Sequence, residues 1–106
     1  MAFAVLLGMM VLDYITGLMV GYANKELSSS IGKKGLIKKA YIIILISAVY
    51  LVQKLGLDFA GYTADGLTIA FALLELLSIV ENGGKLGVPV PQWLKDAIAA
   101  LKGKVA

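Results

Sequence analysis

The stretch that decides the fold is residues 67–82, LTIAFALLELLSIVEN, an almost wholly apolar segment with Glu75 near its middle and Glu81 near its end. A charged side chain at the centre of a membrane helix costs roughly 2.5 to 3.5 kcal/mol on insertion scales, so such a residue needs a partner or a function. We therefore interpret this segment as a membrane-spanning helix and Glu75 as the first candidate functional residue.

The composition indicates that lipid surrounds much of the chain. Of the 106 residues, 59% are hydrophobic and only 16% are charged, well below the quarter that is typical of soluble domains. A soluble domain of this size cannot bury so much apolar surface inside itself, because small domains leave a large share of their surface exposed. The sequence thus predicts a single all-α membrane domain.

Two further segments are apolar and long enough to cross a bilayer. The first, 2–22, would be about 30 Å long at 1.5 Å per residue. It lacks a basic start and Asp13 interrupts its apolar core, so we interpret it as a span rather than a secretory signal peptide. The second, 36–55, contains no acidic residue, as expected of a supporting helix. We therefore expect three transmembrane helices, at 2–22, 36–55 and 67–82.

The connections between these spans differ in charge. Residues 23–35 form a basic loop, whereas 56–66 form a short outer turn without lysine. Because lysines favour the cytoplasmic side, we expect a multi-pass protein of the bacterial cytoplasmic membrane with its N-terminus outside and its C-terminus in the cytoplasm. Interfacial side chains facing the anionic inner leaflet are then expected at Lys33, Lys34, Lys38, Lys39, Glu81, Trp93, Lys95 and Lys102.

The C-terminal segment 91–106 is too polar to cross a membrane. Its apolar residues recur along one side of a helix and its lysines along another, so we expect an amphipathic helix. Trp93 at its start favours a position on the membrane surface over packing against a partner. Glu81 precedes Lys85 by four residues, which predicts a helical ion pair near the membrane surface.

Small and polar residues form one stripe on each of two spans. In the first span Asp13, Gly17 and Gly21 recur every four residues, which predicts a face for close packing in an oligomer. In the third span a polar stripe either forms hydrogen bonds that hold a helical bundle together, or faces water or a neighbouring subunit inside an assembly. The buried acid favours the assembly. This stripe consists of Thr68, Phe71, Glu75, Ser78 and Asn82.

The two acids in the predicted spans lie at similar depth. Counted at 1.5 Å per residue, Asp13 and Glu75 are both near the bilayer midplane. Two neighbouring carboxylates can share a proton in a tightly packed state, whereas ionised carboxylates favour hydration. We hypothesise that a lipid-packed form and a water-lined homo-oligomer interconvert with protonation, membrane potential and protein density. Asp13 and Glu75 would then have a gating role.

Missing residue types argue against several function classes. The chain has neither cysteine nor histidine, so it cannot form a disulfide, a thiol nucleophile, a histidine base or a soft-ligand metal site. All of its basic residues are lysines, and arginine, which contacts bases and phosphates in a bidentate manner, is missing. We expect no enzymatic activity, no cofactor and no metal. The basic charge is expected to serve the membrane surface rather than nucleic acid.

Short motifs in a fixed order resemble a known family. The first half of the chain contains DYITG at 13–17, NKELSS at 24–29, GKKG at 32–35 and KK at 38–39. The second half contains ELLSIVEN at 75–82, LGVPVP at 86–91 and WL at 93–94. Each motif is short, but together they cover nearly the whole chain. In this combination they resemble the holin family of Gram-positive phages, which includes clostridial toxin-secretion holins.

This resemblance implies a small inner-membrane protein that accumulates harmlessly and then oligomerises into a lesion. A phage endolysin or, in some relatives, a toxin leaves the cytoplasm through it, without necessary direct contact. Two other classes stay open. A proton-conducting or transporter subunit also places a membrane carboxylate beside a glycine-rich helix, although three spans with two acids fit that class poorly. The other class is a non-permeabilising membrane adaptor or antiholin.

Overall fold

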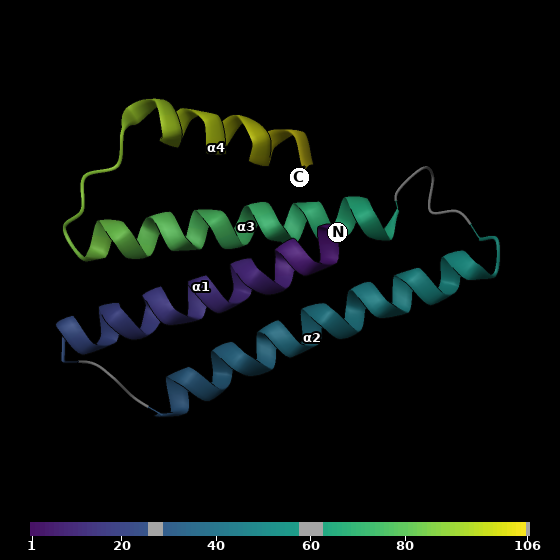
Figure 1. Cartoon of the computed structure of the whole chain (residues 1–106), viewed down its shortest axis with the longest axis horizontal. Coiled ribbons are helices and arrows are strands. Elements are labelled where there is room, and N and C mark those ends of the chain that lie inside the picture. The colour runs from purple at the N-terminus through teal and green to yellow at the C-terminus, as the bar shows by residue number, and fades with distance from the viewer. Residues whose placement is uncertain (26–28, 58–62, 106) are drawn as a thin grey trace.

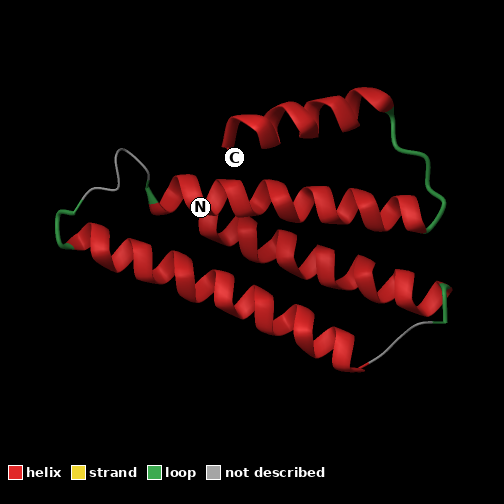
Figure 2. Ribbon diagram, turned by 180° about the vertical axis from the view of Figure 1, so that it is seen from behind, coloured by secondary structure: helices red, strands yellow, loops and turns green. Residues whose placement is uncertain are grey.

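The computed structural model describes residues 1–25, 29–57 and 63–105, and that part of the chain is helical, without strands (Figures 1 and 2). The prediction of an all-α protein is thus confirmed for the described residues. The basic loop is shorter than expected, because residues 29–35 already belong to the second helix. The helices are α1 (Ala2–Ala23), α2 (Ser29–Lys54), α3 (Ala64–Lys85) and α4 (Gln92–Val105).

Helix α3 is the centre of the arrangement. It contacts each of the other three helices. Helices α1 and α3 run side by side in the same direction, and α2 runs in the opposite direction (Figure 1). Helix α4 folds back along α3, so that its C-terminal turns lie beside the middle of α3 (Figures 1 and 2). Residues 92–105 form a helix as expected, and Ile98 of α4 is buried. The position of this helix on the membrane surface stays a prediction.

The start of α3 is fixed by two side chains. The Thr63 hydroxyl accepts a hydrogen bond from the Gly66 amide at 3.0 Å, which satisfies one of the free N–H groups of the first turn. The Gln53 side-chain carbonyl, at the end of α2, accepts a hydrogen bond from the Ala64 amide at 2.6 Å. The second contact joins the end of α2 to the start of α3.

A small apolar core lies between α1, α2 and α3. Its buried members are Leu6, Met10 and Ile46, and Leu67 and Phe71 of α3 pack against them. Most other large apolar side chains of α1 and α2 point outward and are exposed. The bundle is therefore apolar on its outside as well as in its centre.

Two of the described helices are long and apolar enough to cross a membrane: α1 and the Gly32–Lys54 part of α2. Only 17% and 6% of their apolar windows are buried in the structure, so they are not core helices of the kind found in soluble domains. The predicted third span falls within α3, which is as long as α1 but carries Glu75, Glu81 and a polar end and is not one of these two helices.

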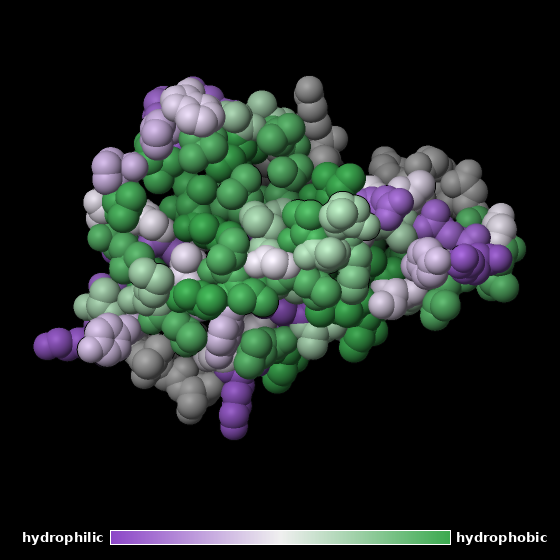
Figure 3. Space-filling model, in the orientation of Figure 1, coloured by the Kyte–Doolittle hydropathy of each residue, from purple (hydrophilic) through white to green (hydrophobic). Residues whose placement is uncertain are grey.

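The outer surface is hydrophobic in its middle and hydrophilic towards its ends (Figure 3). In Figure 3 hydrophobic residues cover most of the middle of the visible face, and hydrophilic residues gather towards the two ends of the long axis. A hydrophobic band between polar ends suits a protein that lies across a bilayer.

Candidate functional site

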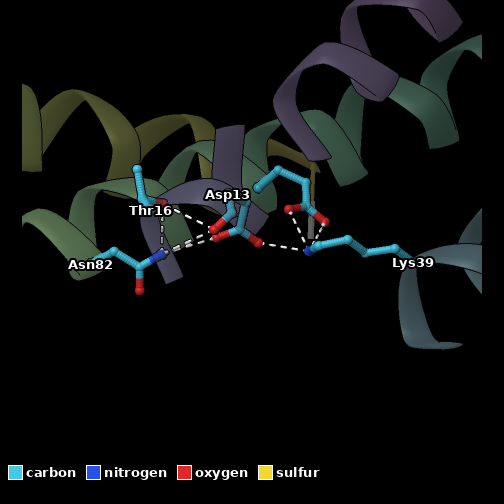
Figure 4. A network of polar contacts seen from close by, with 5 residues as sticks. Asp13, Thr16, Lys39 and Asn82 are labelled. Atoms are coloured by element: carbon cyan, nitrogen blue, oxygen red, sulfur yellow. Dashed lines mark hydrogen bonds and ion pairs between the residues drawn. The ribbon is translucent and has the colours of Figure 1, made fainter. Parts of the chain in front are cut away.

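One ammonium group lies between the two acids that the sequence singled out. The Nζ atom of Lys39 lies 2.7 Å from Oδ2 of Asp13 and 3.1 Å from Oε2 of Glu75 (Figure 4). The other carboxylate oxygen of Glu75, Oε1, is 3.4 Å away. The three residues come from α2, α1 and α3 respectively, so a single cation joins all three helices of the bundle.

A second set of hydrogen bonds extends this cluster along α3. The side-chain amide of Asn82 donates to Thr16 Oγ1 at 2.8 Å and to Asp13 Oδ1 at 3.2 Å (Figure 4). The Thr16 hydroxyl in turn donates to the backbone carbonyl of Asp13 at 3.0 Å. We call the five residues connected in this way the ionic network: Asp13, Thr16, Lys39, Glu75 and Asn82.

Helix geometry explains why these residues meet. Asp13 and Glu75 both lie in the middle turns of 22-residue helices that run in the same direction, so their carboxylates reach the same depth. Asn82 lies seven residues after Glu75 and hence on the same face of α3. Gly17 lies across from it, where a Cβ atom would be 3.9 Å from the Asn82 amide nitrogen, an ordinary van der Waals contact.

The network is largely shielded by the bundle. The side chains of Lys39, Asp13 and Glu75 are 18%, 11% and 8% exposed, so each charge depends on the others for compensation. If all three are ionised, two negative charges face one positive charge and the cluster carries a net charge of −1. Such a cluster can hold helices together or exchange protons between its members. Among the described residues there is no acid, cysteine and histidine cluster suited to a metal ion.

The structure corrects the expected role of Lys39. The sequence placed it at the membrane interface, near the start of the acid-free span predicted at 36–55, because 23–35 was interpreted as a loop. Since α2 starts at Ser29, Lys39 lies well inside the helix and reaches both acids rather than the headgroups. Thr16 was not considered at all. Both residues lie within the short motifs that carry the family resemblance, and that was the only sequence signal for them.

The polar stripe of α3 faces its own chain. Thr68 is 2% exposed, Glu75 is 6% exposed, and Asn82 contacts α1. The Thr68 hydroxyl donates to the Ala64 carbonyl of its own helix at 2.7 Å, and Ser78 is half-buried. A role of Thr68, Ser78 and Asn82 in oligomer packing stays a prediction. The packing of Gly17 and Gly21 against a second copy stays a prediction.

Most of the remaining interfacial candidates are exposed. This group consists of Lys33, Lys34, Lys38, Glu81, Trp93 and Lys95. Glu81 and Lys85 are both exposed, and the described part of the chain has no ion pair between them, in contrast to the expected helical pair. Lys102 belongs to α4, but its side chain lies outside what the structure describes.

Comparison with known proteins assigns the family. The sequence profile of the bacteriophage holin family matches residues 1–103. The chain belongs to the bacteriophage holin family. Holin-family membership and the two apolar helices together indicate a membrane protein.

Three curated relatives are similar to this chain over most of its length. An uncharacterized protein of Halalkalibacterium halodurans is 33% identical over 94% of this chain and 77% of its own length. An uncharacterized protein of Clostridium perfringens is 36% identical over 98% of this chain and 77% of its own length. A 14.9 kDa protein of the nagH 3′ region in Clostridium perfringens is 38% identical over 88% of this chain and 70% of its own. No solved structure matches the chain significantly.

Proposed function

We propose that this chain is a holin that accumulates in the bacterial cytoplasmic membrane as a closed helical bundle and then assembles with further copies into a lesion. The observation that supports this most directly is the ionic network. Two acids at mid-helix would be costly in lipid if unpaired, yet Lys39 lies at hydrogen-bonding distance from both. A bundle with compensated charges inside and apolar side chains outside can accumulate without disturbing the bilayer.

The same contacts support a third crossing by α3. Helix α1 and most of α2 have the length and composition of membrane spans. Glu75 contacts Lys39, which also contacts Asp13 in the middle of α1, so α3 must lie at the same depth as the other two helices. We infer three transmembrane helices, with the N-terminus outside. The exposed Lys33 and Lys34 at the start of α2 then face the anionic inner leaflet.

Within one chain Lys39 already compensates the charges of Asp13 and Glu75. Shielding of these acids is therefore not the reason why copies assemble in this proposal. In this proposal the ionic network holds α1, α2 and α3 in the closed form, and the homo-oligomer forms when bundles rearrange at high density. The strength of the network then sets the threshold for the lesion. A phage endolysin or a toxin would pass through without a specific contact, and the chain itself would catalyse no reaction.

Inducible expression in bacteria tests this proposal. The chain is expressed with and without a co-expressed wall hydrolase that has no export signal, while membrane potential, viability and culture density are followed. Abrupt loss of potential followed by hydrolase-dependent lysis is the expected result. Proton-specific uptake without hydrolase release would indicate a proton carrier instead, and an unchanged potential at every expression level would indicate an adaptor or antiholin.

Neighbouring lysines provide a matched pair of variants for this assay. Lys39→Met removes the central cation, whereas Lys38→Met removes an exposed lysine from the same turn of α2. We expect the first variant to shift the time of lysis and the second to follow the parent. Equal timing for both variants would contradict a role for the network in the threshold.

A further inference from the structure

A hollow lies where the C-terminal part of α2 meets the first turns of α1 and α3. Its volume is about 380 Å³, and Phe3 of α1, Ile46 of α2 and Ala64 of α3 all line it. Thr68 lines it as well, but its hydroxyl already donates to the Ala64 carbonyl at 2.7 Å. Ile46, Ala64 and Thr68 are the buried members of the lining, at 4%, 6% and 2% exposed. The inside of the hollow is therefore mainly apolar.

The hollow runs along one half of the proposed membrane span. Asp65 lines it and precedes Glu75 of the ionic network by ten residues of α3, about 15 Å along the helix. Half of a hydrocarbon layer of about 30 Å is the same distance, so Asp65 lies at the level of the headgroups when Glu75 lies near the midplane. Lys54 ends α2, and Ile46 lies eight residues before it, about 12 Å deeper. The hollow therefore extends from the headgroup level into the hydrocarbon layer, as an acyl chain does.

Charges of both signs lie at the end of the hollow that is nearer the headgroups. Tyr50 lines the hollow, and the Lys54 ammonium lies 5.0 Å from the centre of the Tyr50 ring. Asp65 lines it from the first turn of α3 and is exposed. The hydrogen bond between the Gln53 side chain and the Ala64 amide, at 2.6 Å, brings Lys54 and Asp65, the next residue on each helix, into one region. The described part of the chain has no ion pair between these two residues, so each charge can contact a headgroup.

This pair of charges distinguishes between lipid headgroups. The phosphate of a purely anionic headgroup is attracted by Lys54, but its excess negative charge is repelled by Asp65. A headgroup with a phosphate and a primary ammonium can form charge-assisted hydrogen bonds with both residues. A choline headgroup carries the same charges, but its nitrogen has no hydrogen to donate to a carboxylate. The charges therefore favour a zwitterionic phospholipid with a primary ammonium.

We propose that the hollow binds one phospholipid of this class, of which phosphatidylethanolamine is the simplest example. An acyl chain fills the apolar space between α1, α2 and α3, where an empty hollow would leave the lining without contacts. The phosphate contacts Lys54 and the ammonium contacts Asp65. This binding site goes beyond the proposed lesion-forming function and depends only on the proposed crossing of the membrane by the three helices.

Native mass spectrometry of the full-length protein in detergent micelles tests this site. Phosphatidylethanolamine, phosphatidylglycerol and phosphatidylcholine with identical acyl chains are added one at a time, and the lipid retained by each chain is measured. Ser47→Leu places extra bulk in the hollow, whereas Ala48→Leu adds the same bulk at the next residue, which is not part of the lining. Both positions are exposed, and circular dichroism shows that each variant keeps its helices. Asp65→Asn removes the partner of the ammonium, and Asp96→Asn at an exposed acid of α4 is its control.

We expect the parent chain to retain one phosphatidylethanolamine about tenfold more tightly than either of the other lipids, because a hydrogen bond between charged groups is gained. Ser47→Leu should lose this retention, and Ala48→Leu should equal the parent. Asp65→Asn should retain phosphatidylethanolamine and phosphatidylglycerol equally, whereas Asp96→Asn should keep the preference of the parent.

Three results would overturn this proposal. Equal retention of the three lipids by the parent would contradict the headgroup contacts. Full retention by Ser47→Leu would place the lipid outside the hollow. An unchanged preference in Asp65→Asn would assign the ammonium to another group. None of these measurements requires a lesion, so their failure leaves the lesion-forming function intact, and an absence of lysis in bacteria leaves the lipid site intact.

Discussion

The ionic network and the contact between α3 and α4 are two very different ways of joining helices in one small chain. The network joins α1, α2 and α3 through charged groups at 2.7 to 3.1 Å, with less than one fifth of each charged side chain exposed. The α4 contact depends on a few apolar side chains, of which Ile98 is the buried one. Lys95 and Asp96 of α4 are exposed.

This difference indicates which parts of the molecule are fixed and which can move. Removing one member of a buried charge cluster leaves an uncompensated charge, so the three-helix bundle should resist rearrangement until the whole cluster is hydrated. An apolar contact depends on its surroundings, because it is favourable in water and nearly neutral in lipid. The bundle of α1 to α3 should therefore behave as one unit and α4 as a separate one.

The largest effect is expected for Lys39→Met, which leaves Asp13 and Glu75 facing each other without a cation. Breaking a buried ion pair by removing one partner costs about 3 to 5 kcal/mol. Thermal unfolding in detergent micelles, followed by circular dichroism, measures the loss, and Lys38→Met is the control. A stability equal to that of the control would mean that the network does not hold the bundle.

Asp13→Asn should have the second largest effect. The neutral amide loses the 2.7 Å ion pair with Lys39, and its NH₂ group is set against a donor, either Lys39 or the Asn82 amide. Hydrogen bonds to charged groups contribute about 1.5 to 3 kcal/mol, which is the loss expected in the same unfolding experiment. Lys39 and Glu75 remain as an ion pair whose charges balance. A loss of stability as large as that of Lys39→Met would therefore contradict the expected order of effects.

Glu75→Gln should be milder than Asp13→Asn. Its contacts with Lys39 are longer, at 3.1 and 3.4 Å, and the glutamine carbonyl can still accept one hydrogen bond. The change also removes the excess negative charge of the cluster. We expect a loss of about 1 kcal/mol, again measured by unfolding in micelles. The double variant with Asp13→Asn should lose more than the sum of the two, because Lys39 is then left without any acid.

The smallest effect on the bundle is expected for Ile98→Ala. It weakens the docking of α4, but the unfolding of α1 to α3 should stay within about 0.5 kcal/mol of the parent, as for a substitution away from the network. Proteolysis of α4 and unfolding of the rest can be followed side by side. If α4 becomes protease-sensitive only when α1 to α3 unfold, α4 belongs to the same folding unit as these helices. The separation of α4 from the three-helix bundle would then be wrong.

Much of the fold could be predicted because it depends on local sequence. Long apolar segments, the acid-free second segment and the amphipathic end predict four helices, and the described residues form four helices in this order. The start of α2 could not be predicted in this way. Its GKKG sequence is typical of a loop, but it is helical here, and Gly32 lies beside the Tyr14 hydroxyl of α1.

The candidate site could be predicted only in part. The equal depth of Asp13 and Glu75 follows from counting residues, and the structure brings both to one point. Residue spacing alone did not identify Lys39 as their common partner, because Lys39 was assigned to the membrane surface together with Lys38. The same error led to the idea that several chains must gather around the acids. Position along a helix, not residue type, separates Lys39 from the exposed Lys38.

The division of the ionic network among three helices has a consequence for the order in which the proposed spans enter the bilayer during synthesis. Helix α1 emerges from the ribosome first and carries Asp13 without its counter-ion, which is supplied only by α2. In the proposed topology, a hairpin of α1 and α2 is therefore the first unit in which Asp13 has a counter-ion. Helix α3 follows, and its Glu75 brings the last charge of the network to a lysine that is already in place.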